Sequence, residues 1–88
     1  MTDDGTLHDL RAQITAIDRA IFAAVNERLR LVAQLKQFKR EQGLDFVDPE
    51  REAALIDERL RENDGPLSAD GLRAFYVELL ALVKREAP

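Results

Sequence analysis

The sequence contains no cysteine among its 88 residues and only one histidine, His8. Without cysteine the chain has no disulfide framework, no thiol nucleophile and no cysteine metal site. A single histidine cannot form a zinc site unaided. These absences exclude disulfide-stapled folds, thiol catalysis and the commonest structural zinc sites.

Long apolar runs are also missing, since none approaches the roughly 18 residues of a membrane span. The stretch 1–5 is acidic and polar, and charge-rich sequence follows it, so it does not resemble a signal peptide. The formal net charge is −4, which opposes general binding to nucleic acid or anionic membranes but allows a local basic pocket for a small anion. We therefore expect a cytosolic protein that binds neither nucleic acid nor membrane.

What the sequence does contain is helical periodicity, in a chain short enough for a single domain over 1–88. The spacing of apolar residues predicts a long helix over about 6–42, followed by helices over about 49–63 and 69–86. Gly43 predicts the end of the first helix, Asp48-Pro49 the start of the second and Ser68 the start of the third. The fold class is therefore all-α. The apolar positions of the first helix are Leu7, Leu10, Ile14, Ile17, Ile21, Val25, Val32 and Leu35.

The length of the first helix predicts an oligomer. About 37 residues would extend about 55 Å, more than the diameter of a compact domain of this size. Two shorter helices cannot cover the whole apolar stripe, so a second copy of the chain is the simplest cover. The alternative is a hairpin in the middle of the segment, which the absence of any turn residue disfavours.

Three basic residues interrupt this pattern. Arg28 occupies one position of the heptad series that also holds Leu35, and either its head reaches water or it faces a cavity that receives an anion. Arg11 and Lys39 lie 28 residues apart, roughly 42 Å along one helix, so they cannot share a site within one chain. Antiparallel helices that cross near Val25 would bring Arg11 of one chain close to Lys39 of the other, although each taken singly reads as an exposed cation.

Two further groups carry charge at unexpected positions. In Asp48-Pro49-Glu50-Arg51-Glu52, Asp48 is explained as a helix cap and Glu52 as a salt-bridge partner, whereas Arg51 opposes the helix dipole. Glu86 continues the apolar stripe of the third helix, where a solvated last turn is the simplest explanation.

Taken together, these stretches resemble the AroQ-type chorismate mutases, and the resemblance runs from Leu7 to about Glu86 without a gap as far as Glu52. The matching stretches are Leu10–Asp18, Asn26–Val32, Lys36–Lys39 and Asp48–Glu52. The turn at Asn63–Leu67 resembles that of members fused to, or associated with, the first enzyme of the shikimate pathway. Such an enzyme is therefore a possible partner.

The resemblance implies a fold of three helices per chain in an intertwined homodimer with two active sites. It implies the rearrangement of chorismate to prephenate, in phenylalanine and tyrosine biosynthesis. That pericyclic reaction needs no nucleophile, metal or cofactor. Catalysis would come from holding the side chain over the ring and stabilising charge on the breaking ether bond.

The resemblance also implies residue roles. Arg28, and Arg11 from the partner chain, match arginines that bind the two carboxylates, and Arg51 matches an arginine that supports that site. Lys39 matches the lysine that donates to the ether oxygen. Asp48 and Glu52 match positions around the ring hydroxyl.

The third helix departs from the family pattern of a serine followed four residues later by Gln or Glu. One register places Leu82 and Glu86 at these positions, and the other places Val83 and Ala87 there. We choose the first because it supplies Glu86 as a second catalytic group at the ether oxygen, where it could donate only when protonated. The serine is absent in either register.

Three alternatives remain open. A related isochorismate–pyruvate lyase or aminodeoxychorismate mutase would use a similar basic pocket, and the 48–52 cluster favours the mutase that recognises a hydroxyl. The irregular third helix is compatible with a low-activity regulatory or interaction module of a shikimate-pathway enzyme. A plain dimeric coiled-coil adaptor would leave Arg28, Arg51 and Glu52 without a purpose.

Overall fold

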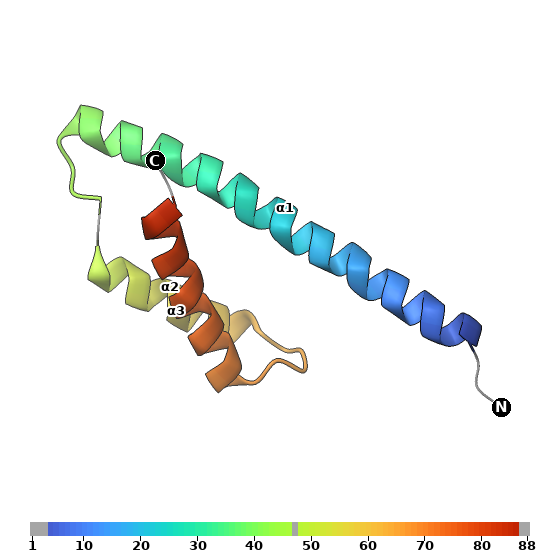
Figure 1. Ribbon diagram of the computed structural model, residues 1–88. Helices are drawn as coiled ribbons and strands as arrows, with labels where there is room; N and C mark the ends of the chain where they lie inside the picture. Colours follow the sequence, from blue (N-terminus) through green and yellow to red (C-terminus); the bar gives the residue numbers. More distant parts are fainter. Residues whose placement is uncertain (1–3, 47, 87–88) are drawn as a thin grey trace.

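The computed structural model describes residues 4–46 and 48–86, and within these ranges it contains three helices and no strand. The helices are α1 (Asp4–Gln42), α2 (Pro49–Glu62) and α3 (Ala69–Glu86). Figure 1 shows α1 as one straight rod, with α2 and α3 beside only one of its halves. The predicted all-α fold of three helices with a long first helix is confirmed, and the hairpin alternative is wrong.

The end of α1 is set by Gly43, whose φ of 69° lies in the left-handed region that glycine tolerates. The Gly43 amide donates to the Arg40 carbonyl at 3.2 Å, and the Leu44 amide donates to the Lys39 carbonyl at 2.8 Å. This pair of bonds is the Schellman motif, which satisfies carbonyls that the end of a helix leaves without partners. The chain therefore turns away from α1 directly after Lys39 and Arg40.

The starts of α2 and α3 are capped by side chains, as the sequence predicts. Asp48 accepts a hydrogen bond from the Arg51 amide at 3.2 Å, and Pro49 occupies the first helical position. Ser68 accepts a hydrogen bond from the Gly71 amide at 3.0 Å. These caps fix where each helix begins.

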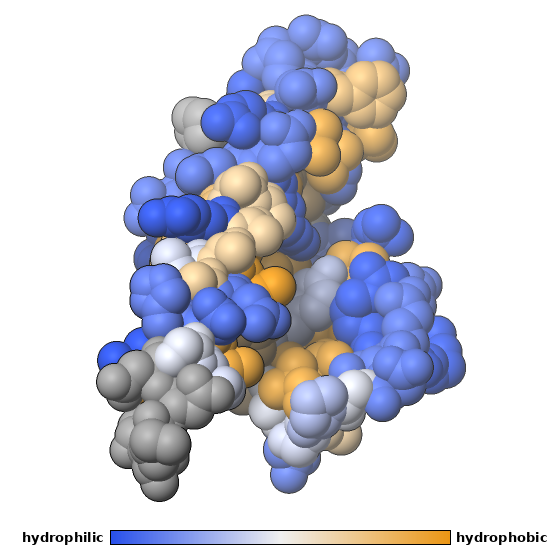
Figure 2. Space-filling view, turned by 90° about the vertical axis from the view of Figure 1, so that its right-hand side faces the viewer, coloured by the Kyte–Doolittle hydropathy of each residue, from blue (hydrophilic) through white to orange (hydrophobic). Residues whose placement is uncertain are grey.

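The two short helices pack against each other and lie beside the C-terminal half of α1, with α3 in contact with both other helices. Among the apolar residues of the described ranges only Leu72 and Val83 are buried, at 9% and 4% exposure. Figure 2 shows apolar side chains open to solvent in the hollow between α1 and the α2–α3 pair. One chain therefore leaves most of its apolar surface uncovered.

Every residue from 5 to 24, in the N-terminal half of α1, is exposed, although Ile21 and Phe22 border an apolar hollow that α3 also lines. Its large apolar side chains include Leu10, Ile14 and Ile17, at 53%, 60% and 61% exposure. The molecule measures 65 × 25 × 18 Å, and its radius of gyration of 17.4 Å exceeds the value of about 12 Å expected for a compact domain of this length. None of the helices in the described ranges is both long and apolar enough to cross a bilayer.

Candidate functional site

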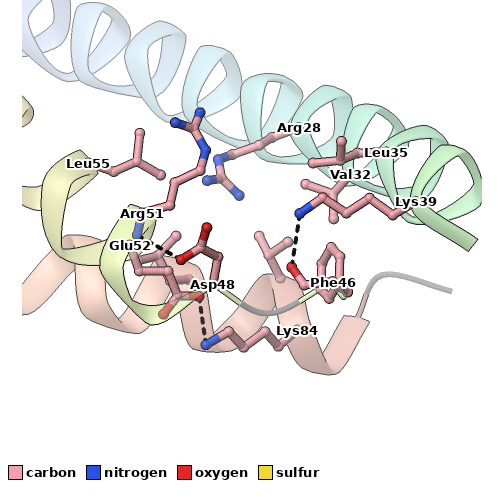
Figure 3. Close-up of a pocket in the computed structure, with 12 residues that line it drawn as sticks. Arg28, Val32, Leu35, Lys39, Phe46, Asp48, Arg51, Glu52, Leu55 and Lys84 are labelled. Atoms are coloured by element: carbon pink, nitrogen blue, oxygen red, sulfur yellow. Dashed lines mark hydrogen bonds and ion pairs between the residues drawn. The ribbon is translucent and has the colours of Figure 1, made fainter. Parts of the chain in front are cut away.

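A pocket between α1, the start of α2 and the end of α3 collects charged side chains from all three helices (Figure 3). We call it the basic pocket, because four cations and two carboxylates line it within a chain of net charge −4. An excess of positive charge in a partly enclosed, low-dielectric hollow attracts a small anion. The charged residues that line the basic pocket are Arg28, Lys39, Asp48, Arg51, Glu52 and Lys84.

Apolar side chains form the remaining wall, and they come from α1, the connection after it, α2 and α3. Such a wall excludes water and strengthens the electrostatic interactions of the charged groups beside it. The pocket therefore suits a ligand that carries both anionic groups and an apolar ring or frame. The apolar lining residues are Val32, Leu35, Phe46, Leu55, Leu80 and Val83.

The α1 side of the basic pocket follows from helical periodicity. Arg28, Val32, Leu35 and Lys39 are separated by four, three and four positions, which places their side chains on one face of the helix. All four line the pocket. Arg28 therefore lines a pocket within the chain, as the second interpretation of its heptad position requires, and the binding of an anion there stays a prediction.

Lys39 is held at the rim of the pocket by the segment that follows α1. Its ammonium group donates a hydrogen bond to the Phe46 carbonyl at 3.3 Å, and it lies 5.8 Å from the centre of the Phe46 ring. The Lys36 ammonium lies 4.9 Å from the centre of the same ring. Attraction between these cations and the ring face holds Phe46 over the pocket and directs Lys39 inward.

The first turn of α2 supplies Asp48, Arg51 and Glu52. Asp48 is occupied as a cap by the Arg51 amide, and the Arg51 guanidinium extends toward the space that Arg28 also faces (Figure 3). Glu52 pairs with Lys84 of α3, with Oε1 and Nζ 2.8 Å apart. The unexpected cation in the first turn of α2 thus has a structural counterpart, because Arg51, although exposed, lines the basic pocket.

Of the seven residues that the sequence proposes for the site, five line the basic pocket together. Those five are Arg28, Lys39, Asp48, Arg51 and Glu52. Arg11 does not, since it lies 17 positions before Arg28, about 26 Å along the helix, in the exposed N-terminal half. Glu86, the seventh, is an exposed residue that is not among the pocket's lining residues.

The rotation of α3 about its own axis determines which of its residues face the basic pocket. Val83 lines the basic pocket between Leu80 and Lys84, whereas Leu82 lines a neighbouring apolar hollow with Ile21, Phe22 and Val25. In the single chain, Val83 therefore borders the basic pocket, whereas Leu82, which belongs with Glu86 in the register chosen from the sequence, borders the neighbouring hollow. Ala87, which belongs with Val83 in the other register, lies outside the described residues.

Two residues of the pocket, one aromatic and one basic, were not predicted from the sequence. Phe46 belongs to the connection between α1 and α2, where no periodicity marks a residue as inward-facing. Lys84 stands in the last turn of α3, where a cation is expected simply because it complements the helix dipole. The available signal was its spacing of four from Leu80 on the inner face of α3.

Comparison with known proteins agrees with this geometry. The family model for chorismate mutase type II matches residues 10–87. Two solved structures of chorismate mutase from Thermus thermophilus superpose with TM-scores of 0.85 (form I) and 0.82 (form II). They are 28% and 29% identical in sequence, and the superpositions cover 89% and 94% of this chain and 98% and 99% of theirs.

Curated relatives include two proteins named T-protein. That of Haemophilus influenzae is 38% identical over 65 residues, which is 73% of this chain and 17% of the relative. That of Enterobacter agglomerans is 40% identical over 53 residues, 60% of this chain and 14% of the relative. The matched part is thus about a sixth of these longer proteins. The family match spans nearly the whole chain and includes the helices that line the basic pocket, so this chain belongs to the chorismate mutase type II family.

Proposed function

We propose that the chain rearranges chorismate to prephenate, and that the product enters phenylalanine and tyrosine biosynthesis. The observation that carries the proposal is the convergence of Arg28, Lys39 and Arg51 on one pocket with an apolar wall. Chorismate is a dianion built on a ring, and the pocket offers complementary charge and an apolar surface to such a molecule. The reaction is unimolecular, so catalysis consists of holding the reactive conformer and stabilising developing charge.

The proposed roles follow the positions of the side chains. Arg28 binds one substrate carboxylate through its planar guanidinium, and Arg51 supports that anion site. Lys39 donates to the ether oxygen, where negative charge grows as the bond breaks, and its bond to the Phe46 carbonyl holds the ammonium at the rim for that task. Asp48 and Glu52 face the ring hydroxyl.

We further propose an antiparallel homodimer that crosses near Val25 and in which the partner subunit's Arg11 completes each pocket. The apolar side chains of residues 5–24, all of which are exposed in the single chain, support this assembly. Burial of each large apolar side chain would contribute about 1.5–3 kcal/mol, and six of them are exposed between Leu7 and Phe22 in each chain. Two-fold symmetry would then give two identical pockets per dimer.

Glu86 is proposed as the second group at the ether oxygen. It lies in the last turn of α3, two positions after Lys84 of the basic pocket, which supports a role near the site. Glu86 is exposed in the single chain, so the proposed role requires that the partner chain shields it from water. The smaller contribution is assigned to Glu86 because Lys39 already lines the pocket.

Partner and location are also part of the proposal. The Asn63–Leu67 turn, in which the Asn63 side-chain amide donates to the Leu67 carbonyl at 2.7 Å, is proposed to dock onto an enzyme of the shikimate pathway. A cytosolic location is proposed because the outer faces of the helices carry charged side chains suited to water. Co-sedimentation with the purified enzyme and cell fractionation test these two points.

The deciding experiment follows the disappearance of chorismate in the presence of purified protein, with isochorismate and aminodeoxychorismate as parallel substrates. We expect turnover of chorismate to prephenate and little turnover of the other two. Pyruvate release from isochorismate, with chorismate untouched, would replace the mutase by the lyase. Binding of prephenate without turnover of any substrate would favour the regulatory module.

A further inference from the structure

Lys84 is a charged residue of the basic pocket, and none of the proposed catalytic or binding roles belongs to it. It rises from the last turn of α3, and its ammonium group lies 2.8 Å from Oε1 of Glu52 at the start of α2 (Figure 3). Their side chains are 40% and 29% exposed, so the pair is partly shielded from water. Both residues line the same pocket.

This ion pair differs in kind from others on the surface. Arg30 pairs with Glu27, and Arg59 pairs with Glu62, at separations of three residues within one helix. Such exposed local pairs contribute little, because water and salt screen the charges and holding two long side chains in one geometry costs entropy. Lys84 and Glu52 belong to different helices, so their contact fixes both a side-chain conformation and the approach of α3 to α2.

The charge of Glu52 creates a problem that the pair solves. An unpaired carboxylate on the wall of a pocket that receives a dianion repels the ligand, and the partly apolar surroundings weaken screening by solvent. With Lys84 in contact, the pair has no net charge. The contact with Lys84 is made through Oε1, and a carboxylate has a second oxygen, Oε2, that can accept a bond from a hydroxyl of the ligand.

We propose that Lys84 is a positioning residue for the rearrangement, which neutralises Glu52 and holds its carboxylate toward the ring hydroxyl of the substrate. This inference rests on the proposed function. Lys84 acts through Glu52 and through substrate binding, because the pair is formed before the substrate arrives. Its effect therefore falls on KM more than on kcat.

The test compares KM and kcat for chorismate in Lys84→Met, Lys84→Arg and Glu52→Gln, and in the double variant Glu52→Gln/Lys84→Met. Lys84→Met leaves Glu52 charged and unpaired, and we expect KM to rise roughly three- to tenfold with kcat within about twofold of the wild type. Lys84→Arg should restore KM to within about twofold, since arginine also pairs with a carboxylate. In the Glu52→Gln background, the added Lys84→Met change should raise KM less than it does in the wild-type background, because no carboxylate is left at position 52 to repel the ligand.

Arg73→Met is the matched control, since it removes one cation from the exposed face of the same helix outside the basic pocket. It should leave both constants unchanged, and circular dichroism of every variant checks that the helices are retained.

A wild-type KM in Lys84→Met would overturn the role of the pair, and so would an unchanged effect of Lys84→Met in the Glu52→Gln background. A large loss of kcat at unchanged KM would instead make Lys84 a group that acts on the reacting atoms. If the wild type neither binds nor turns over chorismate, the proposed function fails and the role of the pair fails with it. If the wild type is fully active and Lys84→Met has the wild-type KM, the role of the pair fails while the proposed function stands.

Discussion

The two halves of α1 share one continuous backbone but have opposite surroundings. In the C-terminal half, Arg28, Val32, Leu35 and Lys39 form a wall of the basic pocket against α2 and α3. In the N-terminal half, the same periodicity places Ile14 and Ile17 on a face that is exposed to solvent. Periodicity therefore establishes which face of a helix is apolar, while coverage of that face depends on what lies beside it.

The uncovered half gives the largest expected effect. Ile14→Asp puts a charge on the stripe that the proposed partner covers, and by symmetry the charge enters the dimer twice, at a cost of several kcal/mol. We expect a shift to monomers, loss of helical content and loss of activity. Sedimentation at micromolar concentration measures the shift. Ala16→Asp, about 200° around the helix from Ile14, is the control and should remain dimeric, and a folded monomeric wild type would contradict the assembly.

In the covered half, Arg28→Ala tests whether that wall serves binding rather than folding. We expect kcat/KM for chorismate to fall on the order of 10²–10³-fold, because a desolvated site for a carboxylate is lost, while helical content stays close to that of the wild type. Arg30→Ala, two positions away and outside the pocket, is the control for charge. Near-normal turnover in Arg28→Ala would show that the pocket is not the active site.

The relation between the two halves is tested by mixing chains. Arg11→Ala alters the uncovered half and Lys39→Ala the covered half, and in the proposed dimer both belong to one composite pocket. A heterodimer of the two variants would have one pocket with both lesions and one with neither, so activity should return to roughly half that of the wild type. Two different affinity tags allow the heterodimer to be purified after subunit exchange. If each residue serves its own chain, each pocket carries one lesion and little activity returns.

The smallest effect is expected at the end of α3. Lys39 is one of the residues that line the basic pocket, and Glu86 is not. We therefore expect Glu86→Ala to lower kcat less than about tenfold and Lys39→Ala to lower it about 10²-fold or more. Comparing kcat of the two variants under saturating chorismate measures the difference. A loss at Glu86 equal to that at Lys39 would support the register with Leu82 and Glu86 and would move the end of α3 into the site.

Much of the site was predictable from the sequence because its residues are local to well-marked helix positions. Arg28 stands out as a cation in an apolar heptad series, and Arg51 stands out as a cation in the first turn of a helix. Phe46 and the rotation of α3 were not predictable, because a connecting segment has no periodicity and a one-residue shift of register turns the inward face by about 100°.

The sequence by itself determined the three helices, their caps and the stop at Gly43, because these depend on side chains a few residues apart. It also determined the apolar stripe on the N-terminal half of α1, since that stripe follows from spacing. Only the tertiary structure decided that Val83 rather than Leu82 borders the basic pocket, and that Lys84 meets Glu52 across two helices. Contacts between helices depend on how each rotates against the next, and that rotation is set by the packing of the whole chain.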